Sequence, residues 1–302
     1  MPPARRRHKP APFGAHQSIA GGYARAVDRA VETGSETLQI FTRNINQWQT
    51  KPIDPAEAAA FRRAVKEAKL AFVVAHDSYL INPASADKAL RAKSIAGLVE
   101  ELKRAECLGI PWVVAHPGAA GEQTLKRAVA RAAAGITEAL RQTAELTAGI
   151  LIETTAGQGS CLGARFEEIG EMLEVIDAQP GLRKRAGVCL DTCHVFAAGY
   201  RLAPQAALDE TLAAFDRTIG LDRLVCIHAN DSKKELGSRV DRHEALGKGK
   251  IGREAFRLIV NHPRLAGIPL VLETPKEGPD GKPTPARDRA NLAILRRLAG
   301  RA

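Results

Sequence analysis

Short apolar segments recur along the chain at nearly even intervals, and they limit the folds open to it more than any other feature. The eight segments are residues 13–16, 38–41, 72–76, 112–116, 150–153, 188–191, 224–228 and 269–273. Runs of four or five apolar and β-branched residues are typical of buried β-strands. Between them lie Ala-, Glu- and Arg-rich stretches with helical spacing, among them residues 56–68, 87–107, 125–148, 166–176 and 204–219. Such alternation of strand and helix predicts a parallel sheet.

The number of predicted strands favours a closed barrel. Residues 72–75 are apolar at every position, which is typical of strands whose two faces are both covered. Eight strand–helix units that close on themselves form a (β/α)8 TIM barrel, which takes about 250 residues. An open, doubly wound sheet is the alternative. Breaks rich in Pro and Gly are short, so we predict one barrel domain over residues 13–302 after a basic, flexible arm at residues 1–12.

Charge and cysteine usage give a broad class. The chain of 302 residues has 44 Lys and Arg against 34 Asp and Glu, and this net charge of +10 suits a polyanionic partner. No apolar run reaches the roughly 18 residues that cross a bilayer. The basic N-terminal residues lack the apolar segment of a secretory signal. Five scattered cysteines indicate a reducing compartment rather than a disulfide framework, so we expect a cytoplasmic protein.

Six of the predicted strands end in a residue that can bind a metal ion. They are His76, His116, Glu153, Asp191, His228 and Glu273, at successive spacings of 40, 37, 38, 37 and 45 residues. Because the C-terminal ends of barrel strands converge on one mouth, these side chains are expected to meet there. Imidazole and carboxylate ligands without thiolate are typical of a catalytic zinc centre, or of a harder Mn or Mg centre.

Two further pairs enlarge this set of ligands. His194 follows Asp191 by three residues, and Asp241 precedes His243 by two. Nine ligands are too many for one tetrahedral ion, but they fit three ions if one carboxylate bridges two of them. His16 closes the first predicted strand, and we expect it to orient ligands from behind rather than to bind metal.

The chain resembles the endonuclease IV family, the zinc-dependent apurinic/apyrimidinic endonucleases, over nearly its whole length. The segments that carry the resemblance are GAHQSIAGG (14–22), FTRNINQW (41–48), HDSYLIN (76–82), HPG (116–118), ETTAGQG (153–159), CLDTCHVFAAG (189–199), HANDSK (228–233) and GSRVDRH (237–243). The resemblance implies three Zn²⁺ per chain, with Mn²⁺ in part of the sites. It assigns the first ion to His76, His116 and Glu153, the second to Glu153, Asp191, His228 and Glu273, and the third to His194, Asp241 and His243.

The resemblance also implies a reaction. A hydroxide activated by the metals would attack the phosphodiester bond 5′ to an abasic site, leaving a 3′-hydroxyl and a 5′-deoxyribose phosphate. Glu273 and Glu153 are the implied catalytic carboxylates, and Glu273 would orient or deprotonate the water. Blocked 3′ ends would be trimmed as a second activity. The implied partner is double-stranded DNA that contains abasic sites or blocked 3′ ends. The resemblance suggests an intracellular monomer, associated with the nucleoid when bound to DNA, and implies no protein partner.

The resemblance places DNA contacts on two loops. Tyr79 matches a position that inserts at the lesion, and Asn44, Gln47 and Trp48 lie on the loop after the second predicted strand. An abasic nucleotide has no base pair to lose, so its extrusion costs a few kcal/mol less than that of a normal nucleotide. Selectivity for damage is then expected to come from how easily the nucleotide leaves the duplex.

The sequence departs from the family pattern at two positions. Asn46 stands where some members carry an arginine that probes the DNA stack, so the wedge is expected to differ here. Thr154 replaces the asparagine that usually follows the bridging glutamate, which affects the orientation of ligands but removes none.

Two other classes of protein remain open from the residues alone. A metal-dependent sugar isomerase or epimerase would present His, Asp and Glu at the same mouth, but it has no evident use for the Asp241 and His243 pair. A DNA-binding protein without catalytic activity would use the cluster as a structural metal site. Structural zinc sites are closed and usually rich in Cys, whereas this set has none.

Overall fold

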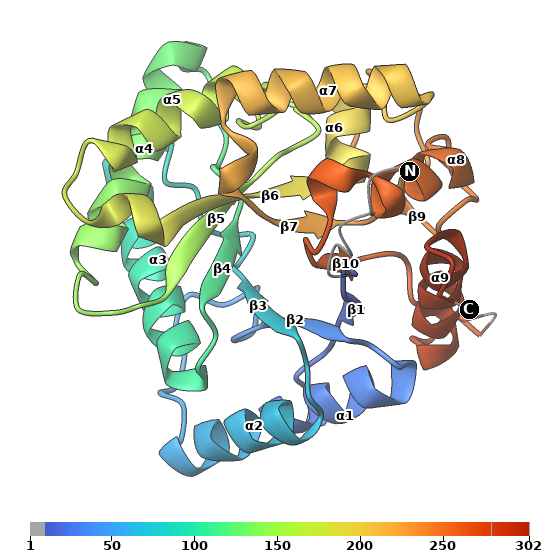
Figure 1. Cartoon of the computed structure of the whole chain (residues 1–302). Helices are drawn as coiled ribbons and strands as arrows, with labels where there is room; N and C mark the ends of the chain where they lie inside the picture. The colour runs from blue at the N-terminus through green and yellow to red at the C-terminus, as the bar shows by residue number, and fades with distance from the viewer. Residues whose placement is uncertain (1–9, 279, 302) are drawn as a thin grey trace, which may run out of the picture.

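Eight parallel strands form a closed barrel at the centre of the molecule, and helices surround it (Figure 1). The computed structural model describes residues 10–278 and 280–301. Neighbouring strands follow the order β1-β10-β7-β6-β5-β4-β3-β2, and pairing of β1 with both β10 and β2 closes the ring. The predicted TIM barrel is therefore confirmed and the open sheet is excluded. Most of the predicted N-terminal arm, residues 1–9, lies outside the described residues.

The barrel strands agree closely with the predicted segments. They are β1 Phe13–His16, β2 Thr37–Phe41, β3 Phe72–His76, β4 Trp112–Ala115, β5 Gly149–Glu153, β6 Ala186–Asp191, β7 Leu224–His228 and β10 Leu270–Leu272. Two short strands, β8 Asp231–Ser232 and β9 His243–Glu244, pair antiparallel as a hairpin above the mouth. His116 and Glu273 lie one residue beyond the ends of β4 and β10, not on their last residues as predicted.

Nine α-helices follow the strands in the part of the chain that the structure describes. They are α1 Tyr23–Thr33, α2 Pro55–Glu67, α3 Lys88–Leu108, α4 Leu125–Arg141, α5 Phe166–Asp177, α6 Thr192–Ala198, α7 Gln205–Thr218, α8 Gly252–Asn261 and α9 Pro285–Leu298. Short 3-10 turns occupy Leu182–Arg185, Leu221–Arg223 and Pro263–Leu265. Among the described residues, no helix has the length and apolar character that a membrane crossing requires.

Local signals explain where several helices begin and end. The Asp54 carboxylate accepts a hydrogen bond from the Ala56 N–H at 2.7 Å at the start of α2, and Asp87 does the same for Ala89 in α3. Gly109 ends α3 in the left-handed conformation, with φ of 71°.

The prediction of one helix over residues 125–148 was too long. The helix α4 ends at Arg141, and its last carbonyls are taken by side chains instead of further turns of helix. Thr143 Oγ1 donates to Ala139 O at 2.9 Å, and Arg185 Nη1 donates to Leu140 O at 2.9 Å. The second of these donors comes from a distant part of the chain, so local periodicity carries no sign of it.

Two apolar layers stabilise the barrel. The larger one lies between strands and helices and includes the fully buried rings of Phe61, Phe166, Phe215 and Phe256. The smaller one fills the barrel interior and consists of Val74, Val114, Leu151, Cys189, Cys226 and Val271. All five cysteines are free thiols, as their spacing predicted.

Arg185 joins three chain segments at the end of the barrel opposite the mouth. It is 8% exposed, and its guanidinium donates to Leu140 O, Thr143 O, Ala148 O and Thr143 Oγ1 at distances from 2.7 to 3.0 Å. Burial lowers the pKa of this guanidinium. Four polar atoms that water cannot reach thus depend on one side chain.

Replacing Arg185 with Leu is expected to lower the free energy of unfolding by about 3 kcal/mol, because several buried carbonyls lose their donor. Urea titration followed by circular dichroism measures this loss. Arg183→Leu, two residues away and 61% exposed on its side chain, is the matched control and is expected to cost less than about 0.5 kcal/mol. Equal losses in the two variants would contradict the role given to Arg185.

Candidate metal centre

The six candidate ligands at or just after the strand ends form one ring at the mouth because of the two-residue period of a β-strand. Each lies two positions after a member of the interior apolar layer, as His76 does after Val74 and Glu153 after Leu151. Side chains two apart on a strand point to the same face. The ring of ligands therefore lies directly above the apolar layer that fills the barrel.

Glu153 lies at the centre of this ring and has no exposed surface. Its Oε2 atom is 3.2 Å from His76 Nε2 and 2.9 Å from His116 Nε2. Its Oε1 atom is 2.9 Å from His228 Nδ1 and 3.4 Å from His194 Nδ1. The two oxygens of one carboxylate thus face different pairs of imidazoles, as a carboxylate that bridges two metal ions does.

The structure gathers the predicted ligands into three groups whose ligand atoms lie within 4.8 Å of one another. The groups are His76, His116 and Glu153; Glu153, Asp191, His228 and Glu273; and His194, Asp241 and His243. These are the same three sets that the resemblance implied. All nine residues are therefore brought together.

The third group depends on two local structures. Asp191 caps α6 by accepting a hydrogen bond from the His194 N–H at 2.8 Å, which fixes His194 one helical turn beyond the strand. Asp241 and His243 come from the β8–β9 hairpin, in which His243 pairs with Ser232. His194 Nε2 lies 3.1 Å from Asp241 Oδ2, and His243 Nε2 lies 3.3 Å from Asp241 Oδ1.

Asp231 holds this hairpin in place. Its buried carboxylate accepts hydrogen bonds from five backbone N–H groups, those of Ser232, Gly247, Gly249, Ile251 and Gly252, at 2.8 to 3.4 Å. A Cβ atom on Gly249 would collide with Asp231 and with the backbone of Ser232, so only glycine fits at this position. A single side chain thereby positions the segment that carries Asp241 and His243.

Backbone carbonyls fix the orientation of the imidazoles. His76 Nδ1 lies 3.0 Å from Asp77 O, His194 Nδ1 lies 2.8 Å from Thr154 O, and His243 Nδ1 lies 3.3 Å from Glu273 O. A carbonyl accepts from Nδ1–H, so the Nε2 lone pair of each ring is directed at the ligand groups.

The environment of two of these rings fits a metal site. The Nε2 atoms of His194 and His243 are buried and lie 3.1 and 3.3 Å from the Asp241 oxygens, but among the described residues neither atom makes a hydrogen bond of good geometry. A buried polar nitrogen without a partner costs roughly 1–3 kcal/mol. Ligation of a metal ion by both nitrogens removes this cost, and the imidazole and carboxylate donors are those that zinc takes in catalytic sites.

Electrostatics also favour cations at this centre. Burial raises the pKa of Glu153, but His228 and His116 outweigh burial and hold that pKa well below its usual range. Burial lowers the pKa of His228, but Glu273 and Glu153 outweigh it and hold the pKa well above its usual range. Glu153 therefore stays ionised and attracts positive charge, which the imidazoles carry when protonated and which divalent ions supply when bound.

The cysteines near the centre are poor ligands. Burial raises the pKa of Cys189 well above its usual range and that of Cys193 to about 12. Both therefore remain protonated thiols at neutral pH, and Cys189 packs in the apolar layer below His228.

Sequence reasoning missed Gln39, a buried amide on β2 that links ligands across the barrel. Its Nε2 donates to Glu273 Oε1 at 2.6 Å, and its Oε1 lies 2.8 Å from His228 Nε2. The amide oxygen accepts from Nε2–H, which leaves His228 Nδ1 free to face Glu153. One feature of the sequence could have revealed Gln39: it is a polar residue two positions after Thr37, on the inward face of a mostly apolar strand.

His16, predicted to orient ligands without binding metal, contacts Gln39 and none of the candidate ligands by hydrogen bond among the described residues. Its Nδ1 is 3.1 Å from Gln39 Nε2, and its ring packs 4.3 Å from that of Phe41. Burial lowers the pKa of His16 to about 3, so the ring is neutral.

Asn230 was also missed, and Thr154 was seen only as a departure. Asn230 donates to Asp191 Oδ2 at 2.6 Å and accepts from the Glu273 N–H at 2.8 Å. Thr154 Oγ1 accepts from the Asp191 N–H at 2.9 Å. The threonine thus contacts the backbone of one ligand with its hydroxyl and the ring of His194 with its carbonyl.

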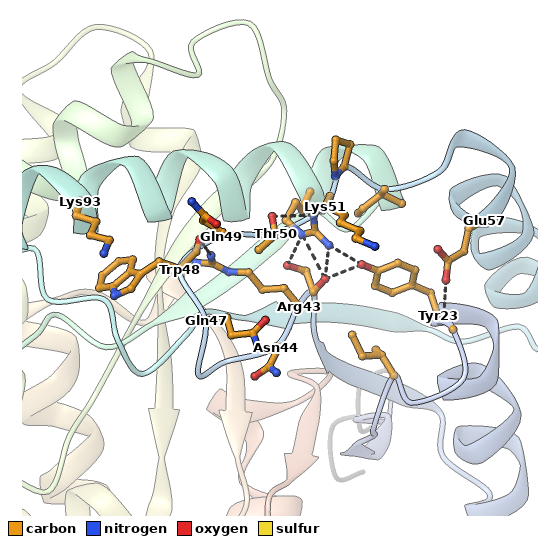
Figure 2. A pocket seen from close by; sticks show the side chains of 16 residues that line it. Tyr23, Arg43, Asn44, Gln47, Trp48, Gln49, Thr50, Lys51, Glu57 and Lys93 are labelled. Atoms are coloured by element: carbon orange, nitrogen blue, oxygen red, sulfur yellow. Dashed lines mark hydrogen bonds between the residues drawn. The ribbon is translucent and has the colours of Figure 1, made fainter.

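The four predicted DNA contacts lie at the rim, outside the ligand groups. Tyr79 is 64% exposed, and its ring is 5.9 Å from that of His76 and 6.4 Å from that of His116. Asn44, Gln47 and Trp48 line a groove of about 1060 Å³ beside the loop between β2 and α2, and Figure 2 shows it from close by. Asn44 and Gln47 are exposed, whereas Trp48 is half-buried.

Comparison with known proteins places the chain in a family. The family described as "Xylose isomerase-like TIM barrel" matches residues 27–298. A curated protein of Chloroflexus aurantiacus, named probable endonuclease 4, is 47% identical over 286 residues, which cover 95% of this chain and 97% of the relative. The crystal structure of endonuclease IV from Thermus thermophilus is 37% identical with a TM-score of 0.81, over 96% of this chain and 100% of that chain.

More distant structures share only the fold. A crystal structure of D-psicose 3-epimerase is 17% identical with a TM-score of 0.69, over 96% of this chain and 99% of that chain. Likeness at that level does not distinguish one chemistry from another. The sequence identity to the endonucleases is much higher and extends over nearly the whole length of each chain. The chain therefore belongs to the endonuclease IV family.

Proposed function

We propose that the chain is a zinc-dependent DNA-repair endonuclease that hydrolyses the phosphodiester bond 5′ to an abasic site in double-stranded DNA. The observation that carries the proposal is the buried carboxylate of Glu153, whose two oxygens face different pairs of imidazoles. Membership of the endonuclease IV family supports it. The products are a 3′-hydroxyl and a 5′-deoxyribose phosphate, as base excision repair requires. The same site trims blocked 3′ ends.

Three ligand groups would hold three Zn²⁺ ions, with Mn²⁺ in part of the sites. Glu153 belongs to two of the groups and would bridge their ions. Bound ions supply Lewis-acid activation of water and neutralise the negative charge that builds up on the phosphate. The His and carboxylate donors suit this use better than the thiolate donors of structural sites.

Two carboxylates, those of Glu153 and Glu273, have different roles in the proposed reaction. Glu153 is fully buried and keeps the first two ligand groups together. The Glu273 side chain is 17% exposed and reaches the mouth, while Gln39 and His228 hold its two oxygens at 2.6 and 3.1 Å. Glu273 is therefore positioned to orient the attacking water and to take its proton.

Recognition of damage would come from the rim. Tyr79 stands exposed above the imidazoles, and Asn44, Gln47 and Trp48 line the neighbouring groove. An exposed aromatic ring can fill the space that an extruded abasic nucleotide leaves in the base stack. The proposed partner is double-stranded DNA that contains abasic sites or blocked 3′ ends, and the proposed active form is an intracellular monomer.

Zinc-loaded protein is expected to contain three ions per chain by inductively coupled plasma mass spectrometry. The variant His243→Ala is expected to contain two, because it removes one ligand of the most exposed group and leaves the other two groups complete. His262→Asn changes a histidine that pairs with Asp209 away from the mouth, and it should keep three. One ion in the wild type would contradict the assignment.

Glu273→Gln is expected to lower kcat by about 100- to 10,000-fold on a duplex that carries one tetrahydrofuran abasic analogue. Gel analysis of a 5′-labelled strand measures cleavage 5′ to the lesion, and a nicked duplex with a 3′-phosphate measures trimming. Chelator-stripped protein should be inactive on both. Glu277→Gln, an exposed carboxylate four residues later, is the control and should retain activity. Intact lesion DNA after incubation with metal-loaded wild type would instead favour a metal-dependent isomerase.

Tyr79→Ala is expected to raise KM for the lesion duplex by about tenfold, because stacking of one base on an aromatic ring contributes about 1–3 kcal/mol. The kcat value should stay within about threefold, since the phenol ligates no metal. Tyr79→Phe keeps the ring and should match the wild type. A loss confined to kcat would place Tyr79 in the chemistry rather than in recognition. Steady-state rates of incision at varied DNA concentration separate the two.

A further inference from the structure

The loop between β2 and α2 is attached to helix α3 by charged side chains that are buried beneath it. Figure 2 shows Arg43 extending toward Trp48, with Tyr23 on the other side of the groove. The Arg43 Nε atom lies 2.5 Å from Glu101 Oε1, and these side chains are 3% and 1% exposed. Arg43 Nη1 also donates to Trp48 O at 3.0 Å. Glu101 on α3 thereby fixes the backbone at Trp48 through Arg43.

Arg104, one helical turn further along α3, attaches both ends of the same loop. Its guanidinium donates to Thr42 O at 2.6 Å and to Lys51 O at 2.8 Å. Its Nη2 also donates to Tyr23 Oη at 2.7 Å, and the Tyr23 hydroxyl donates to Thr42 O at 2.6 Å. Arg104 is 6% exposed, so these bonds form away from water.

The packing around this network is close. Gly97 on α3 leaves room for Ile81 and for Arg43, because a Cβ atom there would lie 3.1 Å from Ile81 and 3.6 Å from Arg43 Nη2. That Nη2 atom is buried without a hydrogen-bond partner among the described residues. Such an arrangement contributes little to net stability, because desolvation of buried ions offsets most of their attraction.

The network also reaches the loop that carries Tyr79. Ser78 Oγ donates to Ile45 O at 2.5 Å, so the residue before Tyr79 is bonded to the residue after Asn44. The two candidate DNA-contact loops are thus joined to one another, and α3 holds one of them from below.

We infer that Glu101 and Arg104 are positioning residues, which hold the Asn44–Trp48 loop in the conformation that binds damaged DNA. The inference rests on the proposed function. Neither residue belongs to the ligand groups, so the network governs affinity for DNA and leaves the cleavage rate alone. A preformed loop binds more tightly because no ordering is required on association.

Arg104→Lys tests the inference because it keeps the positive charge and loses the forked donors that reach Thr42, Lys51 and Tyr23. KM for the abasic duplex is expected to rise by about tenfold, with kcat within about twofold and metal content unchanged. Lys103→Gln, an exposed neighbour on α3, removes a charge without touching the loop and is the control. If the only contribution of Arg104 were its charge, Arg104→Lys would match the wild type and Lys103→Gln would bind less well.

A second readout reports the loop directly and needs no DNA cleavage. The chain has two tryptophans, so Trp112→Phe leaves Trp48 as the one emitter, with Lys93 Nζ 4.6 Å from its ring centre. In that background Arg104→Lys should make Trp48 more accessible to acrylamide quenching, and Tyr23→Phe should do so to a smaller degree. If Arg104→Lys fails to fold, Tyr23→Phe still tests the network, because it removes only the hydroxyl that accepts from Arg104 and donates to Thr42 O.

The outcomes separate the inference from the function on which it rests. Raised quenching together with raised KM supports the positioning role. Unchanged quenching and unchanged KM in a folded Arg104→Lys protein overturns it, as does a loss confined to kcat. Wild-type protein that fails to cleave the duplex refutes the proposed function and with it the inferred effect on DNA affinity, whereas the quenching result would still report whether α3 orders the loop.

Discussion

A carboxylate with no exposed surface lies at the centre of the barrel mouth, surrounded by four imidazoles. Burial of an ionised carboxylate costs several kcal/mol unless positive charge and hydrogen bonds compensate for it. The chain meets this need with a ring of inward-facing ligands and with a set of amides and carbonyls that orient them. Many of the polar side chains at this end of the barrel compensate for the buried charge of Glu153, directly or by orienting the imidazoles that face it.

Sequence alone predicted the barrel strands and named the nine candidate ligands that the structure brings together. Periodicity explains six of the nine, because a residue such as His76 lies two positions after an interior residue, and the repeat of strand and helix brings each such position to the same mouth. The boundaries were wrong where a contact from far along the chain decides them. The end of α4 depends on Arg185, more than forty residues away, and no local pattern carries that information.

The residues that orient the ligands were harder to predict for a related reason. Gln39 looks like an ordinary member of a strand, and Asn230 like part of a loop, until the barrel closes and brings their amides against ligands from other strands. Asp231 gains its role only when five backbone amides converge on it. Local sequence reveals a ligand by its type and spacing, but a residue that acts through a ligand is defined by the packed structure.

Arg185 lies at the end of the barrel opposite the ligands, where its guanidinium ties together the segments before β5 and β6. The apolar layer in the barrel interior separates that end from the candidate metal centre. Natural variation at the lower end can therefore raise or lower thermal tolerance while the geometry of the mouth stays the same. In a lineage that moves to a hotter or colder habitat, substitutions at this end of the barrel can adjust stability without changing the residues that carry out the chemistry.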